Sequence, residues 1–209
     1  MGTVLISNTS LSWSTLDSLF NGTAHYRLSR EAKKSILKSH QLLNNLLDSD
    51  NKIYGVNTGF GKLSNVSISS EDLKKLQLNL IRSHACGVGK PLDPGVIRIA
   101  MVLKLMTWAK GFSGISPELS QLLLDMLNHD ILPIIPRKGS VGASGDLAPL
   151  AHLACSMIGD GDVCFNNRIT TAKLALRKSG LKPIVLKAKE GLSLINGTQI
   201  STALAIRAI

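Results

Sequence analysis

The sequence predicts a mainly α-helical fold with a few short strands. Apolar residues recur at the helical spacing in several segments, and serine, aspartate, proline and glycine mark where those segments start and stop. Hydrophobic residues make up 44% of the chain and charged residues 18%, which is too much apolar material for a disordered chain. Aromatic residues make up only 4%, so the core must be mostly aliphatic, which suits packed helices more than a sandwich of short strands.

The first 85 residues predict one strand and three helices. Ser29 lies directly before a segment whose apolar residues, among them Ile36 and Leu43, fit the helical period. Serines and acidic residues at 69–72 mark the start of a later helix, and Gly87 follows it as a stop signal. The expected elements are a strand at 3–6, a brief helix capped by Ser14-Thr15 and ending near Asn21-Gly22, a helix from 29 to about 47, a loop at 53–65, and a helix from 69 to about 85.

The remaining residues predict further helices and a second glycine-rich loop. Pro94 stands near the first turn of a helix that reaches Lys110, and Ser116-Pro117 begins another that ends before Pro133. The later expected elements are a loop at 137–145, a buried helix at 146–158 with His152 in the core, a small hairpin at 164–169, a helix at 170–179, and one continuous helix at 188–209.

The formal net charge of +10 is compatible with a nucleic-acid or membrane-surface partner. The basic residues are scattered in ones and twos, however, with no run of five and no interleaved aromatic residues. Solvated surface charge is therefore the favoured interpretation, and nucleic-acid binding the weaker one. The apolar stretch at 99–109 is interrupted by Lys104 and is too short to span a bilayer.

The three cysteines, Cys86, Cys155 and Cys164, predict free thiols in a cytoplasmic protein. Their number is odd, no Cys-x-x-Cys occurs, and no secretory signal precedes them. No cluster of histidine, cysteine and aspartate has metal-ligand spacing, so we expect no metal.

The densest functional signal is the segment 139–150, which reads GSVGASGDLAPL. It does not fit a phosphate-binding P-loop, because Asp146 stands where the lysine of that motif would follow Gly145. Its glycine spacing does not fit a dinucleotide-binding motif, and Asp146 also replaces the final glycine of a nucleophile elbow. Two interpretations remain open: a flexible loop in which Ser144 or Asp146 caps the next helix, or a loop with chemistry of its own.

The chemical interpretation is that Ala143, Ser144 and Gly145 close into a ring. The amide nitrogen of Gly145 would attack the carbonyl carbon of Ala143, and loss of two waters would leave a 4-methylidene-imidazol-5-one. Gly145 has no Cβ to shield its nitrogen, Ser144 supplies the hydroxyl that is eliminated, and Ala143 is small enough for close approach. A helix N-terminus opened by Asp146 would make the ring more electrophilic.

Residues 139–150 closely resemble the signature of the aromatic amino-acid ammonia-lyases and aminomutases, the family that uses this self-made cofactor. The resemblance runs from about residue 3 to residue 209, and five further segments match in order and spacing. These are YGVNTGFG at 54–61, RSHACGVG at 82–89, GFSG at 111–114, KEGL at 189–192 and NGT at 196–198. The resemblance implies an α-rich N-terminal region that leads into the start of a long-helix bundle.

The resemblance also implies a role for each matching residue. In the family reaction ammonia leaves an α-amino acid without a redox cofactor, because the amine adds to the methylidene carbon contributed by the serine and a base takes the β-proton. Tyr54 is implied as that base, and it needs a positive environment because an ordinary tyrosine pKa is about 10. The implied residues are Tyr54, Ala143, Ser144 and Gly145 for catalysis, His84 and Asn196 for substrate binding, and Gly61, Gly142 and Asp146 as support.

Each implied role has a structural alternative that stays open. Tyr54 could be buried by its ring with a hydrogen-bonded hydroxyl, and His84 could be a structural hydrogen-bonding group. Asn196 could cap a helix or serve a turn, because Asn-Gly is a common turn pair. Asp146 could cap the helix, assist ring closure or orient the loop.

The pair Ser83-His84 resembles the histidine-specific members of the family, whereas the tyrosine- and phenylalanine-specific members have patterns like His-Leu and Phe-Leu. A polar pair suits an imidazole, because a site without polar partners would leave the ring nitrogens unpaired. The resemblance therefore implies conversion of L-histidine to trans-urocanate and ammonia, in histidine degradation. Tyrosine or phenylalanine ammonia-lyase activity is the alternative.

Family members continue well beyond Ile209, so we expect residues 1–209 to be the N-terminal portion, with the cofactor-bearing domain and the first part of the central bundle. The family is homotetrameric, and its active sites are shared among three subunits. We therefore expect this chain to be inactive by itself. A non-catalytic truncated remnant is the alternative.

Overall fold

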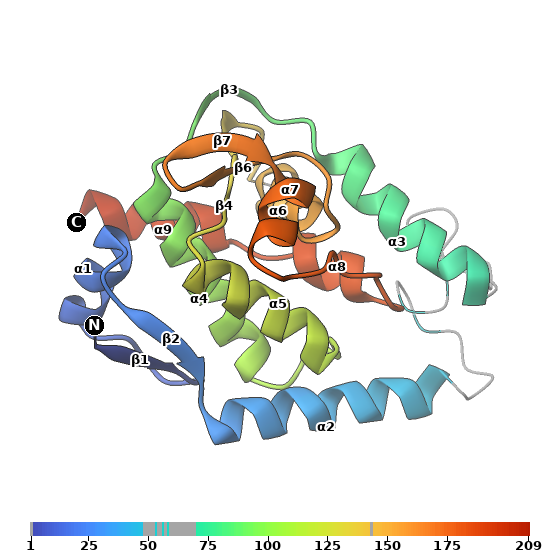
Figure 1. Ribbon diagram of the computed structural model, residues 1–209. Coiled ribbons are helices and arrows are strands. Elements are labelled where there is room, and N and C mark those ends of the chain that lie inside the picture. The colour runs from blue at the N-terminus through green and yellow to red at the C-terminus, as the bar shows by residue number, and fades with distance from the viewer. Residues whose placement is uncertain (1, 48–52, 54–55, 57, 59–69, 143) are drawn as a thin grey trace.

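Two consecutive helices in the middle of the chain form the centre of the structure. Helix α4 (Pro94–Ala109) is mostly buried, and α5 (Pro117–Asn128) packs beside it. Figure 1 shows α2 (Arg30–Leu47) along the lower edge and α3 (Ser70–His84) at the right. The computed structural model describes residues 2–47, 53, 56, 58, 70–142 and 144–209. The expected mainly α-helical fold with a few short strands is confirmed.

The expected first strand is confirmed, and it pairs with a strand that we did not predict. β1 (Thr3–Ile6) runs parallel to β2 (His25–Leu28), and α1 (Trp13–Asn21) connects them. Strand β2 is held from its other side by Asn128, whose side chain accepts from the Tyr26 amide at 2.8 Å and donates to the Tyr26 carbonyl at 3.0 Å. A four-residue strand that depends on such a distant partner gives little signal in the sequence.

Side-chain caps define where several helices begin. The expected cap of the first helix was wrong, because the hydroxyl of Ser12 accepts from the Thr15 amide at 3.2 Å and the helix begins one residue before Ser14. The other expected starts near residues 29, 94 and 116 are confirmed. The capping side chains are Ser12 for α1, Ser29 for α2, Asp93 for α4 and Ser116 for α5.

The expected hairpin at 164–169 is confirmed, and it belongs to a small antiparallel sheet. Its turn residues Asn166 and Asn167 have φ values of 52° and 57°, a conformation that asparagine tolerates better than most residues. The helix expected to end before Pro133 stops earlier, at Asn128, and a short strand follows it. The sheet contains β4 (Leu132–Pro133), β6 (Asp162–Phe165) and β7 (Arg168–Thr171).

The expected continuous helix at 188–209 was wrong. The chain forms two helices, α8 (Glu190–Ile195) and α9 (Gln199–Ala208), which are separated by a turn at 196–198. Gly197 has a φ of +141°, which no residue in a right-handed helix can adopt. The apolar residues on both sides of the turn have helical spacing, and this periodicity concealed the break.

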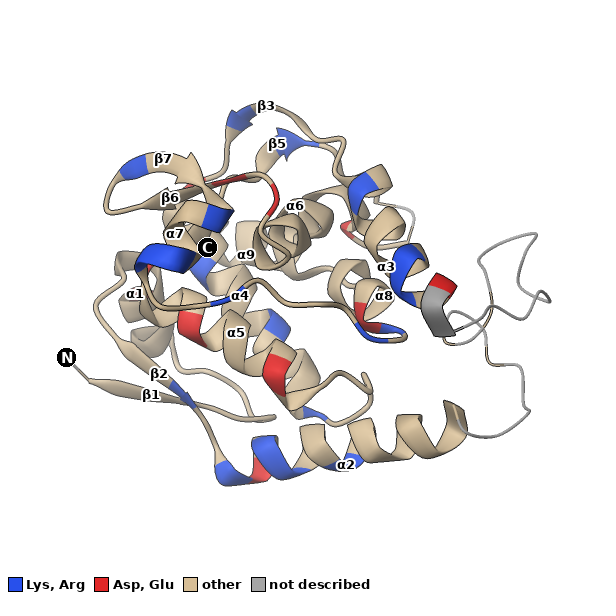
Figure 2. Cartoon of the chain, turned by 45° about the vertical axis from the view of Figure 1, so that its right-hand side comes forward, with Lys and Arg blue, Asp and Glu red and all other residues tan. Residues whose placement is uncertain are grey.

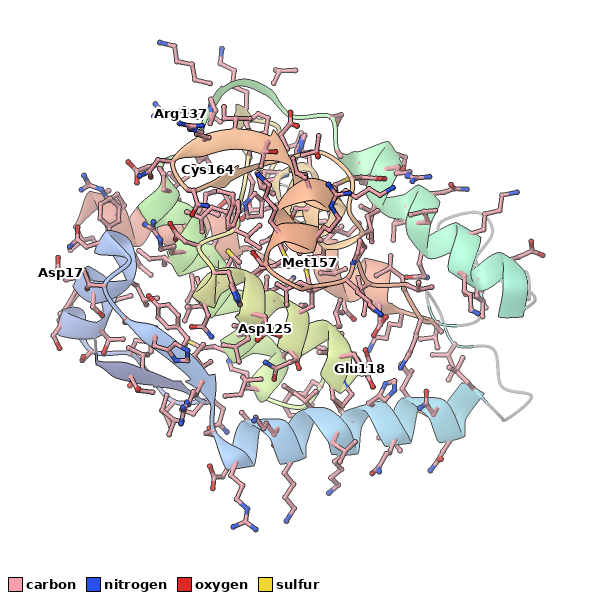
Figure 3. The ribbon with its side chains drawn as sticks, viewed as in Figure 1. Asp17, Glu118, Asp125, Arg137, Met157 and Cys164 are labelled. Carbon is pink, nitrogen blue, oxygen red and sulfur yellow. The ribbon has the colours of Figure 1, made fainter. Side chains whose placement is uncertain are left out.

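The remaining elements include the strand before the glycine-rich loop and the helix after it. β3 (Val88–Pro91) pairs antiparallel with β5 (Pro136–Lys138), α6 (Leu147–Met157) follows the glycine-rich loop, and α7 (Ala172–Lys178) follows β7. Figure 3 shows Met157, at the end of α6, in the interior, where its side chain is buried.

The basic residues do not gather on one element. Figure 2 shows lysine and arginine on α2, α3, α7 and the β3–β5 pair, which lie on different sides of the molecule. Within the described residues, the positive charge is therefore spread over several elements. Of the helices in the described part of the chain, none has the length and hydrophobicity needed to cross a membrane.

Candidate active site

The segment 139–146 joins β5 to α6, and its last residue is the buried Asp146. Asp146 occupies the N-cap position of α6, but its carboxylate makes no cap hydrogen bond. The carboxylate instead accepts from the Ser140 hydroxyl at 2.9 Å, from the Ser201 hydroxyl at 2.5 Å and from the Ser201 amide at 2.7 Å. Asp146 thus connects Ser140, at the start of its own loop, to Ser201 on α9. Of the roles considered for its side chain, these contacts fit orientation of the loop and not capping of the helix.

Gly145 lies in a position that leaves no room for a side chain. Its φ is +97°, and a Cβ on it would stand 2.5 Å from the carbonyl oxygen of Gly197. The same oxygen accepts a hydrogen bond from the Asp146 amide at 2.7 Å. The turn at 196–198 therefore packs directly against the end of the glycine-rich loop, while Gly142 and Ser144 are exposed.

Lys104 binds the turn at 196–198 from α4. It is fully buried on α4, and its ammonium group donates to the Asn196 carbonyl at 2.9 Å and lies 3.5 Å from the side-chain oxygen of Gln199. Burial lowers the pKa of Lys104 to about 7, and the negative charge of Asp146 opposes part of that shift. We did not predict a role for Lys104, because the sequence shows only a lysine that interrupts an apolar helix.

Asn196 ends α8, and its amide donates to the Leu192 carbonyl. Its side chain is exposed and makes no hydrogen bond within the part of the chain that the structure describes. The backbone of Asn196 therefore serves the turn, as the structural alternative proposed, and its carboxamide is left available for another contact.

His84 is the last residue of α3 and is half-buried. Its Nδ1 lies 2.8 Å from the Leu80 carbonyl oxygen, which can only accept, so Nδ1 carries the proton in the neutral ring. The Ser83 hydroxyl donates to the same carbonyl at 3.1 Å and lies 3.2 Å from Nδ1. The backbone of α3 thus sets the tautomer, and Nε2 of the neutral imidazole offers a lone pair.

The segment that follows His84 is bound to the glycine-rich loop. The Gly87 amide donates to Nε2 of His152 at 3.0 Å, and a Cβ on Gly139 would lie 3.1 Å from the Gly87 Cα. We expected His152 to be a core residue, and this was wrong. It is half-buried and links α6 to the segment that follows His84. Burial lowers the pKa of His152, which favours the neutral form that can accept the Gly87 hydrogen.

The pairing of β3 with β5 continues this connection. Val88 lies opposite Lys138 in the ladder. The Arg137 side chain donates to the Pro91 carbonyl at 3.2 Å, and Figure 3 shows it close to β3.

Glu190 holds the other end of α8 in place. It is buried, and its carboxylate accepts from the Ser116 amide at 2.9 Å and from the Lys187 amide at 2.7 Å. Backbone amides thereby satisfy a charge that would be costly to bury without partners. The KEGL segment thus joins α8 to the start of α5.

The structure brings several predicted site residues together through backbone contacts. Gly145 and Asp146 meet the Asn196–Thr198 turn directly, and His84 is connected to the loop through Gly87 and His152. Tyr54, Gly61 and Ala143 lie outside the described residues. Sequence reasoning missed Lys104, Ser140 and Ser201, which hold the loop and the turn.

Two further chemical features concern cysteines and metals. Cys86, Cys155 and Cys164 are free, as expected, and burial raises the pKa of the Cys155 thiol to about 11. Across the described ranges, no group of three or more histidine, cysteine, aspartate and glutamate side chains is placed to hold a metal ion.

The fold is shared with ammonia-lyases and aminomutases of known structure. A histidine ammonia-lyase from Trypanosoma cruzi is 39% identical with a TM-score of 0.91, and the match covers 99% of this chain and 40% of that one. The ergothioneine-degrading enzyme ergothionase from Treponema denticola is 30% identical with a TM-score of 0.93, covering 98% and 41% of the two chains. The phenylalanine aminomutase of Pantoea agglomerans is 30% identical with a TM-score of 0.90, covering 99% and 39%.

The family described as aromatic amino acid lyase matches residues 11–209, and the chain belongs to this family. A histidine ammonia-lyase of Treponema denticola is 43% identical over 206 residues, which are 99% of this chain and 41% of the relative. A histidine ammonia-lyase of Bartonella tribocorum is 45% identical over 204 residues, which are 98% and 40%. The chain therefore spans about two fifths of the length of the curated relatives it matches.

Proposed function

We propose that residues 1–209 form the N-terminal part of an enzyme that deaminates L-histidine without oxidation, giving trans-urocanate and ammonia. The observation that carries the proposal is the identity to relatives named as histidine ammonia-lyases, 43% and 45% over almost the whole chain. Among the solved structures, the histidine enzyme is 39% identical, a tyrosine aminomutase 33% and the phenylalanine aminomutase 30%. This difference favours histidine over the phenylalanine or tyrosine alternative.

The cofactor we propose is a methylidene-imidazolone formed from Ala143, Ser144 and Gly145. The described residues fit it in one specific respect: a Cβ on Gly145 would stand 2.5 Å from the Gly197 oxygen, so this position requires the residue whose nitrogen must close the ring. When formed, the group would supply an electrophile for the substrate amine. Asp146 and the turn at 196–198 would hold its C-terminal side.

Each side chain has a proposed task in the reaction. The lone pair on Nε2 of His84 can accept a hydrogen from the substrate imidazole, and Ser83 helps to hold the ring that offers it. Asn196 has an exposed carboxamide that can bind the substrate carboxylate. Tyr54 is proposed as the base that takes the β-proton, by its match to the family tyrosine. The α6 N-terminus follows the loop directly and adds positive potential there.

We further propose that the complete protein is a cytoplasmic homotetramer with a small-molecule substrate and neither a nucleic-acid nor a membrane partner. The three free thiols support a reducing compartment. The family resemblance supports sharing of the active site among subunits. On this view residues 1–209 alone are inactive, because the remaining pocket residues come from the rest of the protein.

The test uses the complete protein that contains residues 1–209. Histidine is added and urocanate absorbance is followed, with phenylalanine and tyrosine as competing substrates. We expect turnover of histidine and its loss in the Ser144→Ala variant. Turnover of tyrosine but not histidine would refute the substrate assignment. Histidine turnover at an undiminished rate in Ser144→Ala would refute the cofactor assignment, and a complete protein that deaminates none of the three would point to a non-catalytic remnant.

A further inference from the structure

Lys104 is placed where a lysine is costly. It lies in the middle of α4, is fully buried, and has apolar neighbours in sequence on both sides. Lysine is rarely fully buried without a partner, because its charged form loses the solvation that water provides. An aliphatic residue would fill the same helix position without that cost, so the contacts of the amino group must account for its presence.

Those contacts lead to one turn. The Lys104 amino group donates to the Asn196 carbonyl at 2.9 Å and lies 3.5 Å from the Gln199 side-chain oxygen. The Gln199 amide nitrogen in turn donates to the Thr107 hydroxyl at 3.1 Å, and the Lys104 nitrogen stands 5.9 Å from the centre of the Trp108 ring. Lys104 and Gln199 therefore fasten the turn between α8 and α9 to the side of α4.

The fastened turn is the one that contacts the end of the glycine-rich loop. The Gly197 carbonyl accepts from the Asp146 amide at 2.7 Å and would lie 2.5 Å from a Cβ on Gly145. Because Asn196 and Gly197 are adjacent, releasing the Asn196 carbonyl frees the peptide next to the one that binds the Asp146 amide and leaves no room for a Cβ on Gly145. Three links thus connect the Lys104 amino group to the end of the loop: the Lys104–Asn196 hydrogen bond, the Asn196–Gly197 peptide bond, and the packing of the Gly197 carbonyl against Gly145 and Asp146.

We propose that Lys104 is a positioning residue for ring closure, which holds the Asn196–Gly197 turn so that the backbone of Gly145 is kept in the conformation required for cyclisation. The inference rests on the proposed function, because it presumes that residues 143–145 cyclise. The lowered pKa of Lys104, about 7, agrees with a group kept in place at a cost in solvation.

The step that Lys104 assists balances without any added reactant. The Gly145 nitrogen forms a bond to the Ala143 carbonyl carbon, and that carbonyl oxygen leaves as water with the amide hydrogens of Gly145 and Ser144. Ser144 then loses its hydroxyl group and its α-hydrogen as a second water, which creates the C=C bond. Lys104 neither gives nor takes a proton in this sequence.

The experiment measures ring closure by mass and does not depend on activity. The complete protein is synthesised as wild type, Lys104→Met and Lys38→Met, and intact mass is recorded at intervals after synthesis. Closure lowers the mass by about 36 Da, the mass of two waters. Lys38 is exposed on α2, so Lys38→Met controls for the loss of one lysine charge.

We expect wild type and Lys38→Met to close at the same rate, and Lys104→Met to close at least about tenfold more slowly. The thermal unfolding midpoint of Lys104→Met is expected within a few degrees of wild type or above it, because the variant removes a buried charge. A merely structural lysine would behave differently: its loss would lower the midpoint, and every folded molecule would still close at the wild-type rate.

A second variant, Gln199→Met, keeps the Lys104–Asn196 bond and removes the weaker link to α4, so we expect a smaller delay. It carries the test if Lys104→Met does not fold: delayed closure supports the inference and an unchanged rate overturns it. If wild type closes and a folded Lys104→Met closes equally fast, the inference is overturned and the proposed function stands. If wild type itself never loses two waters, the proposed function falls and the inference falls with it.

Discussion

The two glycines on either side of Ala143 and Ser144 have opposite surroundings. Gly142 has a φ of +66°, and a Cβ there would meet no atom of the described residues within 4 Å. Gly145 also has a positive φ, +97°, but a Cβ there would collide with the backbone of Gly197. The difference teaches that the loop is tightly held at its C-terminal end, where Asp146 and the turn at 196–198 lie, while its middle, at Gly142, faces solvent.

Gly145→Ala places a methyl group at the C-terminal end of the loop, where there is no room for it, and should have the largest effect on stability and cyclisation. The added methyl group would overlap the Gly197 carbonyl, and alanine also resists the positive φ. We expect a loss of about 3 kcal/mol or more in the free energy of unfolding and almost no cyclised protein. Chemical denaturation and intact mass measure the two effects. Complete cyclisation in this variant would show that the contact does not constrain the loop.

Asp146→Ala should have the next largest effect. It removes an acceptor for three hydrogen bonds and leaves the Ser201 amide without its partner. We expect a loss of about 2–4 kcal/mol in unfolding free energy. Asp146→Asn keeps one oxygen acceptor and is the matched control. Equal stability of the alanine and asparagine variants would contradict the importance of these bonds.

The pH dependence of the unfolding free energy should reveal the burial of Lys104. The pKa of Lys104 is about 7 in the folded chain and about 10.5 when unfolded, so the unfolded state binds more protons between these values. The cost of burial is therefore fully present below pH 7 and is relieved as the pH rises towards 10.5. Wild type should gain up to about 1.4 kcal/mol per pH unit in unfolding free energy relative to Lys104→Met between pH 7 and 10.5. Parallel pH profiles for the two proteins would exclude a buried lysine of this kind.

Gly142→Ala tests the open end and should have the smallest effect. The only expected cost is that of placing alanine in the left-handed region, about 1 kcal/mol. The mass loss that marks ring closure should be complete, because the added methyl group displaces no atom of the residues that the structure describes. A block of cyclisation as severe as that of Gly145→Ala would remove the distinction between the two ends.

Much of the fold could be predicted because its signals are local. The starts of α4 and α5 follow from Pro94 and Ser116-Pro117, and the hairpin turn follows from Asn166-Asn167, since each depends on neighbouring residues. The family segment at 139–150 also located the glycine-rich loop.

The features that sequence reasoning missed depend on distant partners. Strand β2 is fixed by Asn128, and the break between α8 and α9 is fixed by contacts of the Asn196 and Gly197 carbonyls with Lys104 and Asp146. A lysine within an apolar helix looks the same in a sequence whether it is buried or exposed. The role of Lys104 next to the candidate site could therefore be recognised only from the packed structure.

The pairing of β3 with β5 has a consequence for how substrate preference can change. It joins the chain after His84 to the chain before the glycine-rich loop through main-chain bonds, with Val88 opposite Lys138. Main-chain bonds are indifferent to the side chains at positions 83 and 84. Evolution, or a protein engineer, can therefore exchange those two residues to suit another amino acid while the frame that presents the loop stays in register.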